Sequence, residues 1–227
     1  MGGWFRRLMK MWGSGIIIAM GQARIGAGVV VLETDRLVLR RWLVSDAALQ
    51  RKLWTERDPR VPPRRRIDAD GRPTLNDLEN RIRRGDPDAS SGLLAIEQRD
   101  RGAVIGSCGL IANDHGQDGE PELAYELLRA VRGQGYATEA SLAVVSWAEE
   151  LGYRRLWATV REWNTASRCV LTKLGFVETT RVERDPIHGN SLFYMKDFSG
   201  ANSTASVNGR NAPQRSGSSQ MQSGASF

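Results

Sequence analysis

The sequence has few of the residues from which disulfide frameworks and metal centres are built. Its 227 residues include two cysteines, Cys108 and Cys169, and two histidines. Two distant cysteines do not make the framework of a disulfide-rich secreted domain, and no cysteine–histidine cluster shows metal-ligand spacing. We therefore expect no metal ion, and a reducing compartment, the cytoplasm, is the default location.

Long apolar runs are also absent. The run from Ile16 to Met20 follows several positive residues, but it is shorter than a signal-peptide core and far too short to span a bilayer. We expect no membrane partner. Residues 1–31 are expected to be a disordered basic extension, with Met20 as a second candidate start. Residues 199–227, rich in Ser, Gly, Asn and Gln, are expected to be a disordered tail, which leaves a folded domain at residues 32–198.

A basic surplus is missing from that folded domain. The chain has a formal net charge of +6. Residues 1–31 contain four basic residues and residues 199–227 contain two, and neither segment has an acidic residue, so residues 32–198 are formally neutral. A nucleic-acid-binding domain concentrates basic residues on its folded part. We therefore expect no nucleic-acid partner for the core.

Hydrophobic patterns divide residues 32–198 into strands and helices. Alternating and β-branched runs predict strands at residues 32–40, 92–98, 103–111, 122–128, 156–160, 177–183 and 191–196. Helical periodicity, capping residues and glycine stops predict helices at residues 46–55, 75–84, 136–151 and 164–174. The first strand is expected to have a polar face.

The order of these elements predicts the fold. A strand, a helix and a second strand between residues 122 and 160, with a short return, imply a parallel, right-handed crossover. Hairpins flank this unit on both sides. The expected fold class is α/β in the broad sense, a mixed α+β domain. It has a mostly antiparallel sheet of six to seven strands, helices on both faces and one parallel βαβ crossover.

A proline-rich loop at residues 57–73 contains Arg64, Arg65 and Arg66. Two interpretations stay open. The arginines belong to a solvated surface loop, or the loop faces a substrate and attracts an acidic target.

The stretch from Arg132 to Ala140 lies between a predicted strand and a predicted helix. Its glycines, Gly133 and Gly135, permit a tight turn and close approach of a ligand to the backbone. The start of a helix offers free N–H groups to an anion, and Arg132 adds a fixed cation. The chain has no P-loop sequence, and Thr138 replaces the third small residue of a dinucleotide fingerprint.

What remains is the pattern Arg132-x-x-Gly135-x-Ala137, which resembles the acetyl-CoA pyrophosphate loop of the GNAT N-acetyltransferases. The closest likeness is to the RimJ/RimL-like branch. A second stretch, from Asn164 to Phe176, resembles the other signature of this family, Asn-x-x-Ser followed by Leu-Gly-Phe. Together the two motifs imply a GNAT-like fold across residues 32–198, with acetyl-CoA as cosubstrate.

The resemblance also implies which residues hold that cosubstrate. These are the loop residues, the end of the preceding strand and the asparagine that reaches the pantetheine arm: Arg132, Gly133, Gln134, Gly135, Tyr136 and Ala137, with Leu127, Leu128 and Asn164.

Catalytic roles are implied in the same way. Glu122 matches a frequent strand carboxylate of the family and is favoured over Glu126 as general base. A solvated carboxylate on the strand face, or a proton path through water, is the alternative. Ser167 matches a position proposed as proton donor to the leaving thiolate. The tyrosine that several N-acetyltransferases use as this acid is replaced here by Leu171.

Three further residues are expected to be non-catalytic. Cys169 lies on an apolar helical stripe with no histidine nearby, so a buried structural thiol is favoured over a covalent acetyl-enzyme. His115 and His188 are loop residues with no partner evident in the sequence, and surface positions are expected for both.

The expected activity is therefore acetyl transfer from acetyl-CoA to a primary amine, by direct attack in a ternary complex. The RimJ/RimL likeness suggests a protein N-terminal α-amine, such as that of a ribosomal protein. Alternatives are a small-molecule amine (amino acid, polyamine or antibiotic), a non-catalytic acyl-CoA-binding regulator, and a nucleic-acid module driven by the basic ends. The fold does not fix the acceptor, and a homodimer stays open.

Overall fold

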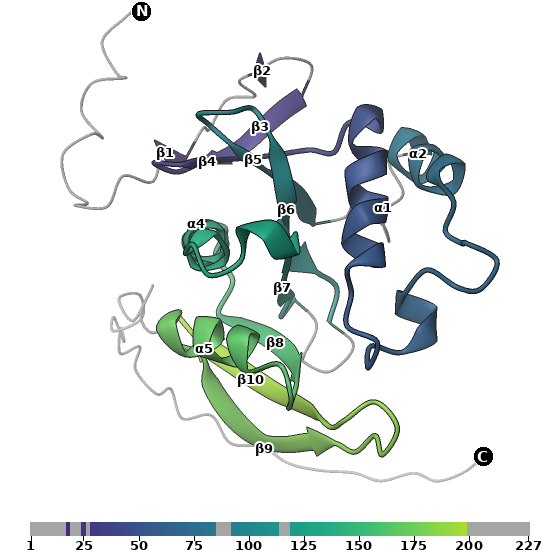
Figure 1. Ribbon diagram of the computed structural model, residues 1–227. Coiled ribbons are helices and arrows are strands. Elements are labelled where there is room, and N and C mark those ends of the chain that lie inside the picture. Colours follow the sequence, from purple (N-terminus) through teal and green to yellow (C-terminus); the bar gives the residue numbers. More distant parts are fainter. Residues whose placement is uncertain (1–16, 19–23, 26–27, 85–91, 114–118, 199–227) are drawn as a thin grey trace, which may run out of the picture.

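The computed structural model describes residues 17–18, 24–25, 28–84, 92–113 and 119–198 (Figure 1). The strands are β1 (Ile17–Ile18), β2 (Arg24–Ile25), β3 (Gly28–Glu33), β4 (Leu37–Arg40), β5 (Leu93–Gln98), β6 (Val104–Ile111), β7 (Glu122–Leu127), β8 (Arg155–Arg161), β9 (Val177–Glu183) and β10 (Ser191–Asp197). The helices are α1 (Ala47–Thr55), α2 (Leu75–Arg84), α4 (Tyr136–Glu150) and α5 (Thr165–Lys173), and short 3₁₀ turns cover Val44–Asp46, Pro63–Arg65 and Arg129–Val131. The tail at residues 199–227 and His115 lie outside the described residues.

One sheet holds these strands in the order β1-β3-β4-β5-β6-β7-β8-β10-β9, and β2 pairs with β3 beside this path. The strand pairs are antiparallel except for β7 and β8, which run parallel. Helix α4 is the crossover between these two strands. The expected fold class is confirmed: a mixed, mostly antiparallel sheet with one parallel crossover.

The start of the domain differs from the prediction. The expected single strand at residues 32–40 is two strands, β3 and β4, joined by a turn in which the backbone N–H of Thr34 donates to the carbonyl of Leu37. Strand β3 begins at Gly28, and β1 and β2 also precede Leu32, so the expected extension at residues 1–31 includes residues of the sheet. This is why the sheet has more strands than expected.

Strand β4 also lacks the polar face that its alternation predicted. All four of its residues are buried, including Arg40, which is 5% exposed. The Arg40 guanidinium donates to Asp46 at 2.7 Å and to Glu97 at 2.6 Å. A buried charge requires such partners, and alternation alone could not reveal them because both carboxylates lie outside the strand.

Helices cover both faces of the sheet, as expected. Helices α1 and α2 pack together on one face, and α4 lies on the other (Figure 1). The larger core cluster joins α4 residues such as Val144 to Leu123, Leu127 and Leu156 of the central strands. A smaller cluster on the α1 face joins Leu53 to Trp42, Ala95 and Leu128. Within the described part of the chain, no helix is long and apolar enough to cross a membrane.

Candidate active site

The two parallel strands diverge soon after they meet. Their register consists of one pair, Glu122 opposite Trp157, whereas the neighbouring β6–β7 and β8–β10 pairs run along whole strands. Beyond that pair, the backbone N–H of Thr159 donates to the Glu122 carboxylate at 3.1 Å, and the Thr159 hydroxyl donates to the same carboxylate at 3.2 Å. The Glu122 side chain thus replaces a strand partner at the point of divergence.

A cleft of about 670 Å³ opens where the strands separate. Residues of both strands line it, together with residues from the two sides of the sheet. We call the first group the glycine wall: Leu127, Arg132, Gly133, Gly135, Tyr136, Ala137, and the α5 residues Ala166, Ser167, Cys169 and Leu171 with Asn164 before them. We call the second group the arginine wall: Arg57, Asp58, Arg60 and Arg65 from the α1–α2 loop, with Glu126, Arg161 and Trp163.

The turn of the glycine wall has the backbone conformation that its sequence predicts. Gly133 and Gly135 have φ of +76° and +85°, in the left-handed region that favours glycine. Helix α4 begins immediately afterwards at Tyr136. The first N–H groups of a helix have no partner within the helix, and they carry the positive end of its dipole. The turn is therefore suited to an anion such as a diphosphate.

Contacts from the start of the domain hold this turn. Arg36 donates to the Gln134 carbonyl at 3.1 Å, and its guanidinium lies 4.5 Å from the centre of the Tyr136 ring. The Glu139 carboxylate accepts from Arg36 at 2.6 Å and from the Thr34 hydroxyl at 2.6 Å. The β3–β4 turn thus fixes both the glycine loop and the first turn of α4.

Arg132 is tied to the strand before it. Its guanidinium donates from Nε and Nη2 to the Leu127 carbonyl, each at 3.1 Å. These bonds fix the cation beside the turn, where a phosphate group would lie. Gln134 and Leu128, which were also predicted to hold the cosubstrate, do not line the cleft. Gln134 contributes its carbonyl to Arg36, and the Leu128 side chain packs on the α1 face with Leu53 and Trp42.

The start of α5 completes the glycine wall. The Asn164 side chain accepts from the backbone N–H of Ser167 at 3.2 Å, which is the capping geometry that the sequence predicts. Cys169 is exposed, so the expectation of a buried thiol was wrong. The stripe that contains Cys169 and Ala166 borders the open cleft rather than the core, and Leu171 is the buried residue of this helix. Cys108 is the buried thiol, and burial raises its pKa to about 12.

Tyr125 is a site residue that sequence reasoning missed. Strand alternation places it on the same face as Leu123 and Leu127, opposite the two glutamates. Its hydroxyl lies in the cleft and donates to the Ser167 carbonyl at 3.1 Å. Burial raises the pKa of this phenol well above its ordinary value, so the group is protonated at neutral pH. Its alternation with Leu123 and Leu127 was visible, but its contact with α5 was not.

The arginine wall contains the second candidate base. Both Glu126 oxygens accept from Arg57, at 2.8 and 2.7 Å. Glu122 does not line the cleft. The first part of the loop at residues 57–73 borders the cleft, and it includes Arg65 but neither Arg64 nor Arg66. The interpretation that this loop faces a substrate stays a prediction.

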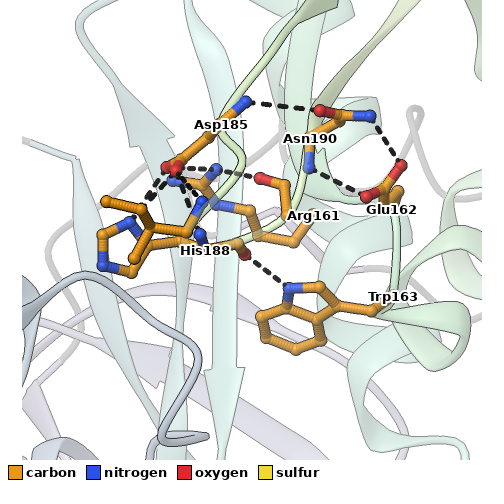
Figure 2. A network of polar contacts seen from close by, with 8 residues as sticks. Arg161, Glu162, Trp163, Asp185, His188 and Asn190 are labelled. Atoms are coloured by element: carbon orange, nitrogen blue, oxygen red, sulfur yellow. Dashed lines mark hydrogen bonds and ion pairs between the residues drawn. The ribbon is translucent and has the colours of Figure 1, made fainter.

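The tip of the β9–β10 hairpin supports this wall (Figure 2). Trp163 donates through its indole N–H to the His188 carbonyl at 2.8 Å, and Arg161 donates to the Gly189 carbonyl at 2.6 Å. Gly189 has φ of +82°, and a Cβ there would lie 2.6 Å from the Trp163 ring. His188, for which the sequence showed no partner, has its Nδ1 3.1 Å from Asp185, three positions earlier in the same hairpin tip.

The structure thus brings most of the predicted site together. Leu127, Arg132, Gly133, Gly135, Tyr136, Ala137, Asn164 and Ser167 line one cleft, and Glu122 bonds to Thr159, which also lines it.

Comparisons with known proteins show which family the chain resembles. The family model described as an acetyltransferase (GNAT) domain matches residues 36–177. An uncharacterized N-acetyltransferase, p20, of Bacillus licheniformis is 29% identical over 154 residues, which cover 64% of this chain and 81% of that protein.

Solved structures share the fold. An acetyltransferase of Agrobacterium tumefaciens has 25% identity and a TM-score of 0.56, with 78% of this chain and 100% of that chain covered. The RimJ protein of Mycobacterium smegmatis, solved in complex with CoA-disulfide, has 22% identity and a TM-score of 0.57, with 71% of this chain and 81% of that chain covered.

Proposed function

Because the chain belongs to the GNAT family of acetyltransferases, we propose that it moves the acetyl group of acetyl-CoA to a protein N-terminal α-amine, as a RimJ/RimL-like enzyme. The observation that carries this proposal is the single cleft into which both the glycine turn and the diverging strands open. A diphosphate held at the turn would direct an attached thioester toward the divergence, where an amine can meet it.

The residues of the glycine wall would hold the donor. The α4 N–H groups and Arg132 provide the charge complement of a diphosphate. Asn164 and the end of β7 at Leu127 lie along the path from the turn to the divergence. Exposed thiols such as Cys169 fit a reducing compartment, the cytoplasm.

The acceptor amine must be neutral before it attacks. At pH 7, deprotonation costs about 1 kcal/mol for an α-amine and about 4.6 kcal/mol for a lysine side chain. A weak base at the divergence is therefore sufficient for an α-amine. We assign this role to Glu122, whose carboxylate is oriented by two bonds from Thr159.

The reaction then proceeds by direct displacement. The amine nitrogen attacks the thioester carbonyl carbon, an amide bond forms, and the carbon–sulfur bond breaks. The amine proton passes to Glu122, and the thiolate receives a proton from Ser167. Tyr125 is a second candidate for this donor, because its phenol is protonated and hydrogen-bonded to the Ser167 carbonyl. Comparing Ser167→Ala with Tyr125→Phe in kcat separates these two assignments.

Acetyl-CoA turnover by the full chain, followed by free-thiol release with an α-amine acceptor, tests the proposal. We expect Arg132→Glu and Gly135→Trp to abolish turnover and CoA binding. Gly152→Trp is the matched control, because Gly152 has a similar φ of +84° but no atom within 4 Å of a built Cβ. Unchanged turnover in both loop variants would contradict the proposal.

A non-catalytic acyl-CoA-binding regulator is the second candidate. One observation favours it: both carboxylates near the divergence already accept two hydrogen bonds each. This candidate predicts CoA binding by calorimetry without acetyl transfer to peptides, amino acids, polyamines or antibiotics. The same amine panel separates a protein N-terminus from a small-molecule acceptor.

A further inference from the structure

The two carboxylates in the arginine wall are already neutralised by two of its arginines. Glu126 is held by Arg57 in a two-bond ion pair, and Asp58 accepts from both Nε and Nη2 of Arg60 at 2.9 Å. No acid of this wall is left to balance a further positive charge in the cleft.

Arg57 is engaged through all three of its side-chain nitrogens. Its Nη1 bonds to the Arg65 carbonyl, and its guanidinium lies 4.3 Å from the Trp54 ring. Arg60 bonds to Asp58 through Nε and Nη2 and lies 4.1 Å from the Trp163 ring, and its side chain is 56% exposed. The charges of both arginines are therefore paired within the wall.

Arg65 differs from them. Within residues 28–84, 92–113 and 119–198, its guanidinium has no hydrogen-bond or ion-pair partner, although it lines the cleft. Desolvation by the cleft walls, and then the positive charge of Arg57, lower the pKa of Arg65 below its ordinary value. Arg65 keeps contact with solvent because the cleft is open. A cation in such a position gains most from an anion that enters the cleft.

Arg161 provides a second guanidinium group in the same cleft as Arg65. Its Nη1 bonds to Asp185 and to the Gly189 carbonyl, which fixes the guanidinium at the hairpin tip (Figure 2). Its Nε and Nη2 have no partner in the described part of the chain. The charge of Arg161 makes a small contribution to the lowered pKa of Arg65.

These two arginines lie on the side of the sheet away from the glycine turn. On β8, Val160 and Ala158 pack in the α4-side core, so Arg161 and Thr159 face the opposite side with Glu122 and Glu126. The diphosphate site at Arg132 is therefore separate from the Arg65 site. The α1–α2 loop side is left for the acceptor.

We propose that Arg65, assisted by Arg161, selects acceptors that carry a carboxylate close to the reacting amine. This inference rests on the proposed function, because it names the acceptor class of the same cleft. The carboxylate is either the α-carboxylate of a free amino acid or the side chain of an acidic residue next to a peptide N-terminus. The same positive charges disfavour the ammonium form of the incoming amine and so favour its reactive form.

Two acceptor pairs test the proposal and separate these sources. Free alanine against alaninamide tests the α-carboxylate, and an alanyl-aspartyl peptide amide against its alanyl-asparaginyl counterpart tests the side chain. The full chain is assayed with saturating acetyl-CoA. We expect at least one acidic acceptor to exceed its neutral partner in kcat/KM by about tenfold, the effect of one charge-assisted contact.

Substitutions of Arg65 test whether this residue causes the preference for acidic acceptors. Arg65→Gln is expected to remove it, by lowering kcat/KM for the acidic acceptor about tenfold more than for the neutral acceptor. Arg65→Lys is expected to restore part of it. Arg64→Gln is the matched control, because Arg64 belongs to the same short turn but does not line the cleft. Equal kcat/KM within both pairs, or a preference that survives Arg65→Gln, would overturn the inference.

A binding arm separates failure of this inference from failure of the proposed function. If no amine is acetylated, the proposed function fails, and binding of the acetylated acidic peptide is compared with that of its asparaginyl counterpart by calorimetry. Tighter binding of the acidic peptide that is lost in Arg65→Gln supports the anion site by itself. Equal binding of the two peptides overturns it.

Discussion

The glycine wall and the arginine wall border the same cleft, but they are constructed differently. The shape of the glycine wall comes from local features, such as the positive φ of Gly135 and the Asn164 cap on Ser167, and the distant Arg36 then holds it in place. The arginine wall depends on side-chain contacts between distant segments. Arg57 reaches Glu126 across 69 positions of sequence, and Trp163 reaches His188 across 25. A backbone-built wall suits a constant ligand, whereas a side-chain-built wall can change its specificity by substitution.

The largest effect is expected on kcat, from substitution of Glu122. Glu122→Gln preserves an oxygen for the Thr159 N–H but removes the proposed base. We expect kcat to fall about 10²-fold or more, the typical contribution of general base catalysis. The fall should be larger for a lysine-like acceptor than for an α-amine. A Glu126→Gln variant that lowers kcat more than Glu122→Gln would transfer the role of base to Glu126.

The next largest effect concerns the side-chain pair that forms the arginine wall. A double-mutant cycle with Arg57→Ala and Glu126→Ala, read out by chemical unfolding, is expected to give a coupling energy of about 1–2 kcal/mol. This range is below that of a fully buried pair, because the two side chains are 16% and 24% exposed. CoA affinity should change less than twofold in each variant. A coupling energy near zero would show that this wall is held by other contacts.

A smaller effect is expected on the glycine wall. Arg36→Ala removes the bond to the Gln134 carbonyl and the Glu139 pair, which is partly exposed. We expect the Kd for CoA to rise about three- to tenfold, equivalent to about 1 kcal/mol. Arg99→Ala is the control, because Arg99 bonds to the Thr34 carbonyl on the same edge without touching the loop. An equal rise of Kd in both variants would show that the effect comes from a disturbed β3–β4 turn and not from the lost bond between Arg36 and the glycine loop.

The smallest effect is a loss of stability at acid pH that comes from the Asp58–Arg60 pair of the arginine wall. The hydrogen bonds from Arg60 lower the pKa of Asp58 to about 2. A lowered carboxyl pKa stabilises the fold above the unfolded value near 4, and this contribution is lost as the pH falls through about 2. Solvent exposure keeps it below about 1 kcal/mol. We expect the stability difference between the wild type and Asp58→Asn to shrink between pH 4 and pH 2. A stability difference that is independent of pH would show that the Asp58–Arg60 ion pair does not stabilise the fold.

The sequence predicted local features correctly, whereas it did not predict contacts between distant segments. The glycine turn was predicted correctly, because it depends on residues close together in the chain, and the observed helix caps at Asn164 and Thr74 are local in the same way. The helix at Leu75–Arg84 was predicted with its observed bounds. Local signals of this kind need no knowledge of the tertiary fold.

The failures involve partners far away in the sequence. Burial of Arg40 depends on Glu97, and the exposed position of Cys169 depends on a cleft in front of α5. The cleft contact of Tyr125 with Ser167 belongs to this group too. Periodicity shows which face of an element is apolar, but it does not show whether that face meets a core, an ion pair or an open cleft.

The single paired position between β7 and β8 has a mechanical consequence. On each side of it, the ladders are continuous, so β3 to β7 form one hydrogen-bonded unit and β8 to β10 form another. Between the two units, the Trp157 N–H bonds to the Pro121 carbonyl, Thr159 bonds to Glu122, and side chains pack in the core. We therefore expect amide hydrogen exchange to resolve the sheet into two cooperative blocks that open separately.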